Sequence, residues 1–137
     1  MQETGIVNRD IGRELGRMGH LDGMMITDAG FAIPNNVPCI DLSIALNKPT
    51  ALEVLEELLN HYSVEKAIIS NATRKVSPSR YRAFTDMLKG IEIGHVSQEE
   101  LRELVKGVKF VIRTGDFTAN SNILLVSGGG TRWYCEK

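Results

Sequence analysis

The sequence predicts a single α/β domain over residues 1–137, with helices on both faces of a mostly parallel sheet. Three observations favour this fold class. Short apolar runs typical of buried strands alternate with stretches whose apolar residues recur at helical spacing. The intervening helices are long enough, at about 10 to 12 residues, to connect parallel strands. A length of 137 residues is that of one domain, and no repeat or linker-like tract divides it.

The first half of the chain opens with a helix. Asn8 can cap its N-terminus, apolar residues recur at Ile11, Leu15 and Met18, and Gly19 is a natural stop. A buried strand follows over residues 23–28. The elements expected next are a proline-containing loop over 31–38, a second strand over 39–46 and a helix after Pro49.

Capping signals mark the starts of the helices that follow. Thr50 and Glu53 form a capping box that opens a leucine-rich helix, and Ser97 and Glu100 form a second one. Pro78 follows Ser77 at the first position of another helix, which runs to about residue 89. The remaining predicted elements are strands over 64–70, 91–96, 109–113 and 122–127, and the helix of the second capping box through 105.

Charge and cysteine content exclude several classes of protein. With 16 basic and 17 acidic residues the net charge is −1, which argues against nucleic acid or an anionic membrane as the main partner. No apolar run approaches the roughly 18 residues of a spanning helix. Cys39 and Cys135 are too few for a disulfide framework, so we expect reduced thiols in a cytoplasmic protein.

His20 and Asp28 flank the predicted strand over 23–28 and form the most informative pair of the chain. An imidazole is the side chain best suited to move protons near neutral pH. A carboxylate at the carboxyl end of a strand sits where open α/β sheets bind ligands. We expect one turn to bring both groups to one pocket. A capping or hydrogen-bonded structural histidine is the alternative that the residues leave open.

His95 lies near the end of the predicted strand over 91–96, so we expect it at the same sheet edge as Asp28. The alternative is a solvent-facing loop residue. The three histidines and Asp28 lack the local pairing of a common zinc site, and HExxH, paired CxxC and GxSxG motifs are absent from the sequence. We therefore expect no metal.

Three segments resemble a known family. They are residues 15–22 (Leu-Gly-Arg-Met-Gly-His-Leu-Asp), 26–34 (Ile-Thr-Asp-Ala-Gly-Phe-Ala-Ile-Pro) and 111–118 (Val-Ile-Arg-Thr-Gly-Asp-Phe-Thr). Together they resemble the D-ribose pyranases, small sugar mutarotases related to the L-fucose mutarotases, and the match runs to about Gly128. The resemblance implies an intramolecular isomerase that interconverts pyranose and furanose forms of D-ribose. It also implies a cytoplasmic homo-oligomer with no metal and no organic cofactor.

The resemblance assigns roles to individual residues. It gives His20 the role of general acid, and it gives Asp28, His95 and Asn122 contacts with sugar hydroxyls. Where the family has Tyr-x-Asn, this chain reads Asn120-Ser121-Asn122. An amide donates and accepts hydrogen bonds but does not ionise, so we expect Asn120 to bind a hydroxyl.

Two other functions stay open at this point. The change at Asn120 permits specificity for a different sugar, such as L-fucose. It also permits a non-catalytic sugar-binding or regulatory protein, against which the intact His20 and Asp28 argue. The apolar tail residues Trp133 and Tyr134 add to the expectation of a closed homo-oligomer, because a small monomer rarely exposes such surface.

Overall fold

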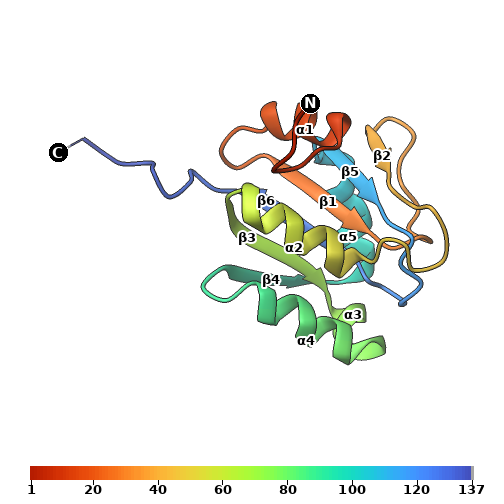
Figure 1. Cartoon of the computed structure of the whole chain (residues 1–137). Coiled ribbons are helices and arrows are strands. Elements are labelled where there is room, and N and C mark those ends of the chain that lie inside the picture. The colour runs from red at the N-terminus through yellow and green to blue at the C-terminus, as the bar shows by residue number, and fades with distance from the viewer. Residues whose placement is uncertain (137) are drawn as a thin grey trace.

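The computed structural model describes residues 1–136 and contains one six-stranded sheet in the order β2-β5-β1-β6-β3-β4 (Figure 1). The strands are β1 (Gly23–Thr27), β2 (Cys39–Asp41), β3 (Val64–Ser70), β4 (Glu92–Val96), β5 (Phe110–Arg113) and β6 (Ile123–Ser127). The helices are α1 (Arg9–Gly16), α2 (Ala51–His61), α3 (Asn71–Val76), α4 (Pro78–Met87) and α5 (Gln98–Leu104), with a 3-10 turn at Val105–Gly107.

The predicted α/β class and mostly parallel sheet are confirmed, with β6 as the exception. β6 is antiparallel to both of its neighbours, β1 and β3, whereas β2, β5, β1, β3 and β4 all run the same way. The reason is the connection before it, which carries no helix. A parallel crossover needs a dozen or more residues and usually a helix, so the short segment from Arg113 to Ile123 returns the chain in the opposite direction.

The sheet has helices on both faces, as predicted. In Figure 1, α2 and α4 lie in front of the sheet and α5 lies behind it. Side chains alternate along β1: Met24 and Ile26 pack in the core under α2 and α4, while Met25 packs in a second core with Leu101 of α5. Because side chains on both faces of the sheet are buried, the sequences of the strands are continuous apolar runs.

Three of the four predicted helix starts are confirmed by side-chain caps, and α4 begins at Pro78 as predicted but without a side-chain cap from Ser77. The side chain of Asn8 accepts hydrogen bonds from the backbone N–H groups of Asp10 and Ile11. Thr50 and Glu53 form the complete capping box of α2. Ser97 accepts a hydrogen bond from the N–H of Glu100 at the start of α5, which is one of the two bonds of the capping box predicted there. These starts are encoded within four residues, which is why the sequence reveals them.

Two elements differ from the prediction. The strand expected over 39–46 ends at Asp41, because residues 44–48 close on themselves through bonds from Ile44 N to Lys48 O and from Lys48 N to Ala45 O. The short helix α3 was not predicted; the Ser70 side chain caps it by accepting from Ala72 N. Within residues 1–136, no helix has the length and apolar character needed to cross a membrane.

Candidate active site

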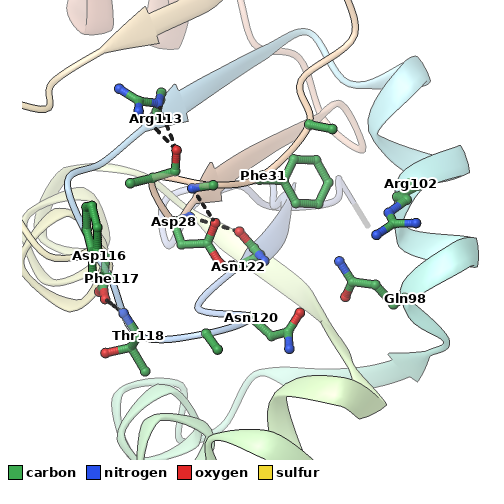
Figure 2. Close-up of a pocket in the computed structure, with 14 residues that line it drawn as sticks. Asp28, Phe31, Gln98, Arg102, Arg113, Asp116, Phe117, Thr118, Asn120 and Asn122 are labelled. Atoms are coloured by element: carbon green, nitrogen blue, oxygen red, sulfur yellow. Dashed lines mark hydrogen bonds between the residues drawn. The ribbon is translucent and has the colours of Figure 1, made fainter.

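A cavity of about 430 Å³ opens where β1 and β5 end and β6 begins (Figure 2). Its volume is in the range of small-molecule sites. The lining comes from the segment after β1, the segment between β5 and β6, and the exposed side of α5. The lining residues are Asp28, Ala29, Gly30, Phe31, Ala32, Gln98, Arg102, Arg113, Asp116, Phe117, Thr118, Ala119, Asn120 and Asn122.

Asp28 directs a partly buried carboxylate toward this cavity. Its backbone N–H donates to Oδ1 of Asn122 at 2.8 Å, and Nδ2 of Asn122 donates to its Oδ2 at 3.3 Å. Oδ1 of Asp28 accepts a further bond from Gly30 N at 3.0 Å. Burial raises the pKa of Asp28, although the hydrogen bonds that its carboxylate accepts from Gly30 and Asn122 act in the opposite direction. The site therefore holds an oriented carboxylate with reduced access to water.

Asp116 anchors the segment between β5 and β6. It is 1% exposed, and its Oδ2 accepts hydrogen bonds from Nη1 of Arg80 at 2.6 Å and from Ala51 N at 2.8 Å. Its Oδ1 accepts from Thr118 N at 2.8 Å. Because α2 begins at Ala51, the carboxylate also stabilises the N-terminus of that helix. Asp116 thus fixes the loop that carries Phe117 and Asn120.

Arg113, the last residue of β5, also lines the cavity. Its Nη1 donates to Asp41 Oδ2 at 3.0 Å and to Ser43 Oγ at 2.6 Å. Its Nη2 donates to Ala29 O at 3.0 Å, a bond drawn in Figure 2. The guanidinium therefore ties the end of β2 to the loop after β1, and its charge is compensated by Asp41.

Asn120 lies in the left-handed region, with φ 57°, a conformation that asparagine adopts more readily than most residues. The unpredicted helix α3 holds this position, because Thr73 Oγ1 donates to Asn120 O at 2.6 Å. Ser77 Oγ donates to the preceding carbonyl, Ala119 O, at 2.7 Å. The backbone around Asn120 is therefore fixed, and its side-chain amide borders the cavity.

Of the residues that line the cavity, sequence reasoning named Asp28, Asn120 and Asn122 and missed the others, among them Gln98 and Arg102. These last two are one helical turn apart on α5 and share the face that borders the cavity (Figure 2). Oε1 of Gln98 is buried and has no hydrogen-bond partner among the described residues. The available signal was the position of Gln98, directly after the end of a parallel strand and at the start of a capped helix.

His20 lies at the other end of the sheet, so the expectation that it shares a pocket with Asp28 of the same chain is wrong. His20 precedes β1 and Asp28 follows it. Five residues of strand at roughly 3.3 Å each separate the two ends by about 16 Å. The turn is well fixed, since Gly19 N donates to Asp22 Oδ2 at 2.8 Å and Leu21 N donates to Ser127 O at 3.0 Å.

The His20 ring has a different set of neighbours. Its Nε2 contacts Oε1 of Glu65 at the start of β3. The Trp133 ring lies beside it, with centroids 6.2 Å apart and planes tilted by 41°. His20, Tyr62, Ser127 and Trp133 border a separate hollow of about 420 Å³. At this end of the sheet the chain therefore places an imidazole between a carboxylate and an indole.

His95 does not border the Asp28 cavity either, which corrects the expectation of a shared site. Along β4, His95 points to the same face as Ile93, which packs in the core under α2 and α4. Its Nε2 is 2.7 Å from the hydroxyl of Tyr81 on α4. Burial and the nearby Arg74 lower the pKa of His95. β4 is also the outermost strand, three positions from β1.

The sequence of this chain is similar to those of known proteins. The model of the RbsD / FucU transport protein family matches residues 1–129. A D-ribose pyranase of Laribacter hongkongensis is 38% identical over 128 residues, which are 93% of this chain and 98% of that protein. A D-ribose pyranase of Pseudothermotoga lettingae is 33% identical over 100% of this chain and 97% of its own.

Solved structures give the same relationship. The structure of Bacillus subtilis RbsD complexed with D-ribose has a TM-score of 0.91 and 33% identity, covering 93% of this chain and 98% of that one. The fucose mutarotase from Streptococcus pneumoniae in complex with L-fucose has a TM-score of 0.77 at 19% identity, with 91% and 95% coverage, and shares the fold. The sequence match, the extent of its coverage and the structural match together show that this chain belongs to the RbsD / FucU family.

Proposed function

We propose that this protein is a sugar mutarotase that interconverts the pyranose and furanose forms of D-ribose. The observation that carries the proposal is the cavity built around the Asp28–Asn122 pair in a chain that matches D-ribose pyranases along almost its whole length. We propose D-ribose rather than L-fucose as the substrate, because the relatives named D-ribose pyranase are 33–38% identical to this chain and the fucose mutarotase is 19% identical.

The cavity has the polar groups that a pentose requires. A sugar hydroxyl is both a donor and an acceptor, so a site for it needs both kinds of partner. Asp28 accepts hydrogen bonds, whereas the amides of Asn120, Asn122 and Gln98 donate and accept. The proposal assigns Asp28, Asn120 and Asn122 to the binding of sugar hydroxyls. We assign no sugar contact to His95, because it faces the other side of the sheet.

Mutarotation needs proton transfer and no change of redox state. When the pyranose opens, the C1–O5 bond breaks, the ring oxygen takes up a proton and the anomeric hydroxyl loses one to water. Closure reverses both transfers: the 4-hydroxyl attacks C1 and gives its proton back to the acid, the carbonyl oxygen takes a proton from water, and the furanose results. We assign the acid to His20, since an imidazole gives and takes protons near neutral pH. A positioned acid contributes about 10²- to 10⁴-fold to such a rate.

His20 and Asp28 can act on one sugar only if two copies of the chain meet. His20 is at one end of β1 and the cavity is at the other, so the contact joins two different surfaces of the same protein. Head-to-tail contacts of this kind close into rings when the rotation allows. We therefore propose a closed homo-oligomer in which His20 of one copy completes the cavity of the next.

Exposed apolar side chains at both ends support such a contact. Leu21 and Trp133, beside His20, are 64% and 69% exposed. Phe117, which lines the cavity, is 65% exposed, and Ile44 and Leu46, in the neighbouring loop, are 86% and 60% exposed. Their two loops are joined by a bond from Phe117 N to Asn47 Oδ1 at 2.9 Å. We extend the proposal to a cytoplasmic location, where exposed thiols such as Cys39 and Cys135 stay reduced.

Subunit complementation tests the proposal. The exchange of D-ribose anomers is measured by NMR line broadening for the wild type, His20→Ala, Asp28→Asn and a mixture of the two variants after subunit exchange. We expect each variant alone to be inactive and the mixture to regain activity, because both residues are intact wherever an Asp28→Asn copy supplies His20 to the cavity of a His20→Ala copy. His61→Ala is the control and keeps activity, since His61 lies on α2, outside the Asp28 cavity.

The outcomes separate the parts of the proposal. An active wild type whose two variants stay inactive when mixed contradicts the shared site. A mass of about 15 kDa by light scattering at micromolar concentration contradicts the oligomer. A wild type that binds D-ribose or L-fucose without exchanging either contradicts the enzyme. That last result favours a non-catalytic sugar-binding protein. The amide of Asn120 in the cavity is the observation that suggests this alternative.

A further inference from the structure

We infer that Glu65 is a positioning residue for His20, fixing the tautomer of its ring so that Nδ1 is the nitrogen that exchanges protons with the sugar. The inference rests on the proposed function of His20. It concerns a carboxylate outside the sugar cavity, at the start of β3, and 45 residues from His20 in the sequence.

The contact involves one nitrogen of the ring. Nε2 of His20 faces Oε1 of Glu65, and both side chains are 45% exposed. An ionised carboxylate only accepts hydrogen bonds, so Nε2 carries the proton in this contact. Nδ1 is then the nitrogen with a lone pair in the neutral ring, and the one that gains a proton when the ring becomes charged.

Both partners are carried by backbone that the sheet holds in place. The His20 turn is bound to the end of β6, because Leu21 N donates to Ser127 O and Ser127 N donates to Asp22 O. The next residue, Gly128, donates to Ser63 O at 2.8 Å, beside the start of β3. A side chain at Gly128 would meet Ser63 Oγ at 2.7 Å and Glu65 Cβ at 3.4 Å, so glycine permits this close approach.

The indole of Trp133 lies beside the same ring. Trp133 is turned back by a bond from its N–H to Gly130 O at 3.3 Å and packs against Gly129, where an added Cβ would be 3.0 Å from Cγ of Trp133. Its ring is 6.2 Å from His20, centroid to centroid. With Glu65 on the Nε2 edge and Trp133 beside the ring, Nδ1 is the atom left for a sugar.

The tautomer matters more here than the stability of the ion pair. An exposed pair contributes little to the free energy of folding, about 0–1 kcal/mol. For the reaction, however, the nitrogen that faces the sugar must donate a proton when the ring is charged. The same nitrogen must offer its lone pair when the ring is neutral. Without Glu65 the neutral ring divides between two tautomers, and only one of them can take the proton of the 4-hydroxyl through Nδ1.

The test measures the tautomer itself. Long-range ¹H–¹⁵N spectra of protein labelled with ¹⁵N-histidine assign the protonated nitrogen of His20 at about pH 8, where an ordinary imidazole is neutral. We expect the wild type to carry the proton on Nε2 and Glu65→Ala to show a mixture of tautomers. Glu57→Ala is the matched control: Glu57 Oε2 is 3.9 Å from Nε2 of His61, and its loss leaves the His20 signals unchanged.

Activity is measured on the same samples. We expect Glu65→Ala to lower kcat for D-ribose exchange by about tenfold, part of what an acid–base group contributes, with KM unchanged. Glu65→Gln retains a carbonyl acceptor and recovers part of both the tautomer and kcat; it also replaces Glu65→Ala if that variant fails to fold. An unchanged His20 tautomer in both variants overturns the inference, as does a changed tautomer with unchanged kcat. An inactive wild type with a Glu65-dependent tautomer refutes instead the proposed function.

Discussion

Asn122 holds Asp28 through both groups of its side-chain amide, although the two residues are 94 positions apart. The amide oxygen accepts from the backbone N–H of Asp28 at 2.8 Å, and the amide nitrogen donates to its carboxylate at 3.3 Å. The antiparallel pairing of β1 with β6 makes this possible, because it brings the end of one strand to the start of the other. One amide thereby fixes both the position and the orientation of the carboxylate.

Replacing Asn122 should therefore affect both stability and sugar binding. Asn122 is 2% exposed, and Asn122→Ala leaves Asp28 N without its partner in a buried environment. We expect a loss of about 1–3 kcal/mol in the free energy of unfolding, measured by urea denaturation, and a higher KM for D-ribose. Asn60→Ala, on the exposed end of α2, should change neither quantity. An unchanged KM for Asn122→Ala would argue against its contact with the sugar.

Asp28 should make stability depend on pH in a defined direction. Burial raises the pKa of its carboxyl above the ordinary 3.8, so the folded state binds this proton more tightly than the unfolded state. The contribution of Asp28 to stability is complete below 3.8 and falls as the pH rises through the raised pKa. Asp28→Asn removes this dependence.

The measurement compares unfolding free energies of Asp28→Asn and the wild type from pH 3 to 7. We expect the difference, variant minus wild type, to become more positive with rising pH. The wild type should also bind D-ribose less tightly as the pH falls through the raised pKa of Asp28, since a protonated carboxyl loses acceptor capacity. A difference that shrinks with rising pH would contradict the raised pKa.

Asn120→Tyr tests the role of the amide in the cavity. The left-handed backbone at Asn120, with φ 57°, should cost the tyrosine about 1 kcal/mol in unfolding free energy. A phenol there can donate a hydrogen bond to the sugar, and we expect the exchange rate to be kept or raised. Asn120→Gly is the control for the backbone: it removes the amide without strain and should weaken D-ribose binding. Equal binding by Asn120→Gly and the wild type would remove Asn120 from the site.

The buried pair of Arg80 and Asp116 should be essential for the shape of the cavity. Arg80→Met leaves the carboxylate of Asp116 buried without its cation, which we expect to cost about 3–5 kcal/mol in thermal or urea unfolding. The double variant Arg80→Met with Asp116→Asn should lose less than the two single losses combined. Arg82→Met, an exposed neighbour, should have little effect. Additive losses in the double variant would show that the two side chains do not interact.

The parts of the fold that the sequence predicted are those determined locally. Helix starts at Asn8, Thr50 and Ser97 depend on bonds within the next three residues, so they can be recognised without knowledge of the fold. The direction of β6 depends instead on where the chain returns after β5. The short α3 has only six residues and too few apolar positions to show a period.

The candidate site was predictable to the same extent. Asp28, Asn120 and Asn122 flank strand ends that the topology brings together, and they line one cavity. The end and the face of the sheet at which a residue lies depend on the tertiary structure, and the predictions about them were wrong. His20 lies at the end of the sheet opposite to Asp28, and His95 lies on the face opposite to the cavity. Gln98 and Arg102 were missed because their importance arises from the packing of α5 beside the cavity.

The position of β6 has a consequence for how the protein folds during its synthesis. This strand is near the end of the chain but lies in the middle of the sheet, between β1 and β3. Until it emerges from the ribosome, β1 with β5 and β2, and β3 with β4, are two separate halves whose inner edges have unpaired backbone groups. Insertion of β6 closes both edges at once and brings Asn122 to Asp28. We therefore expect the sheet and the candidate site to be completed in the same step.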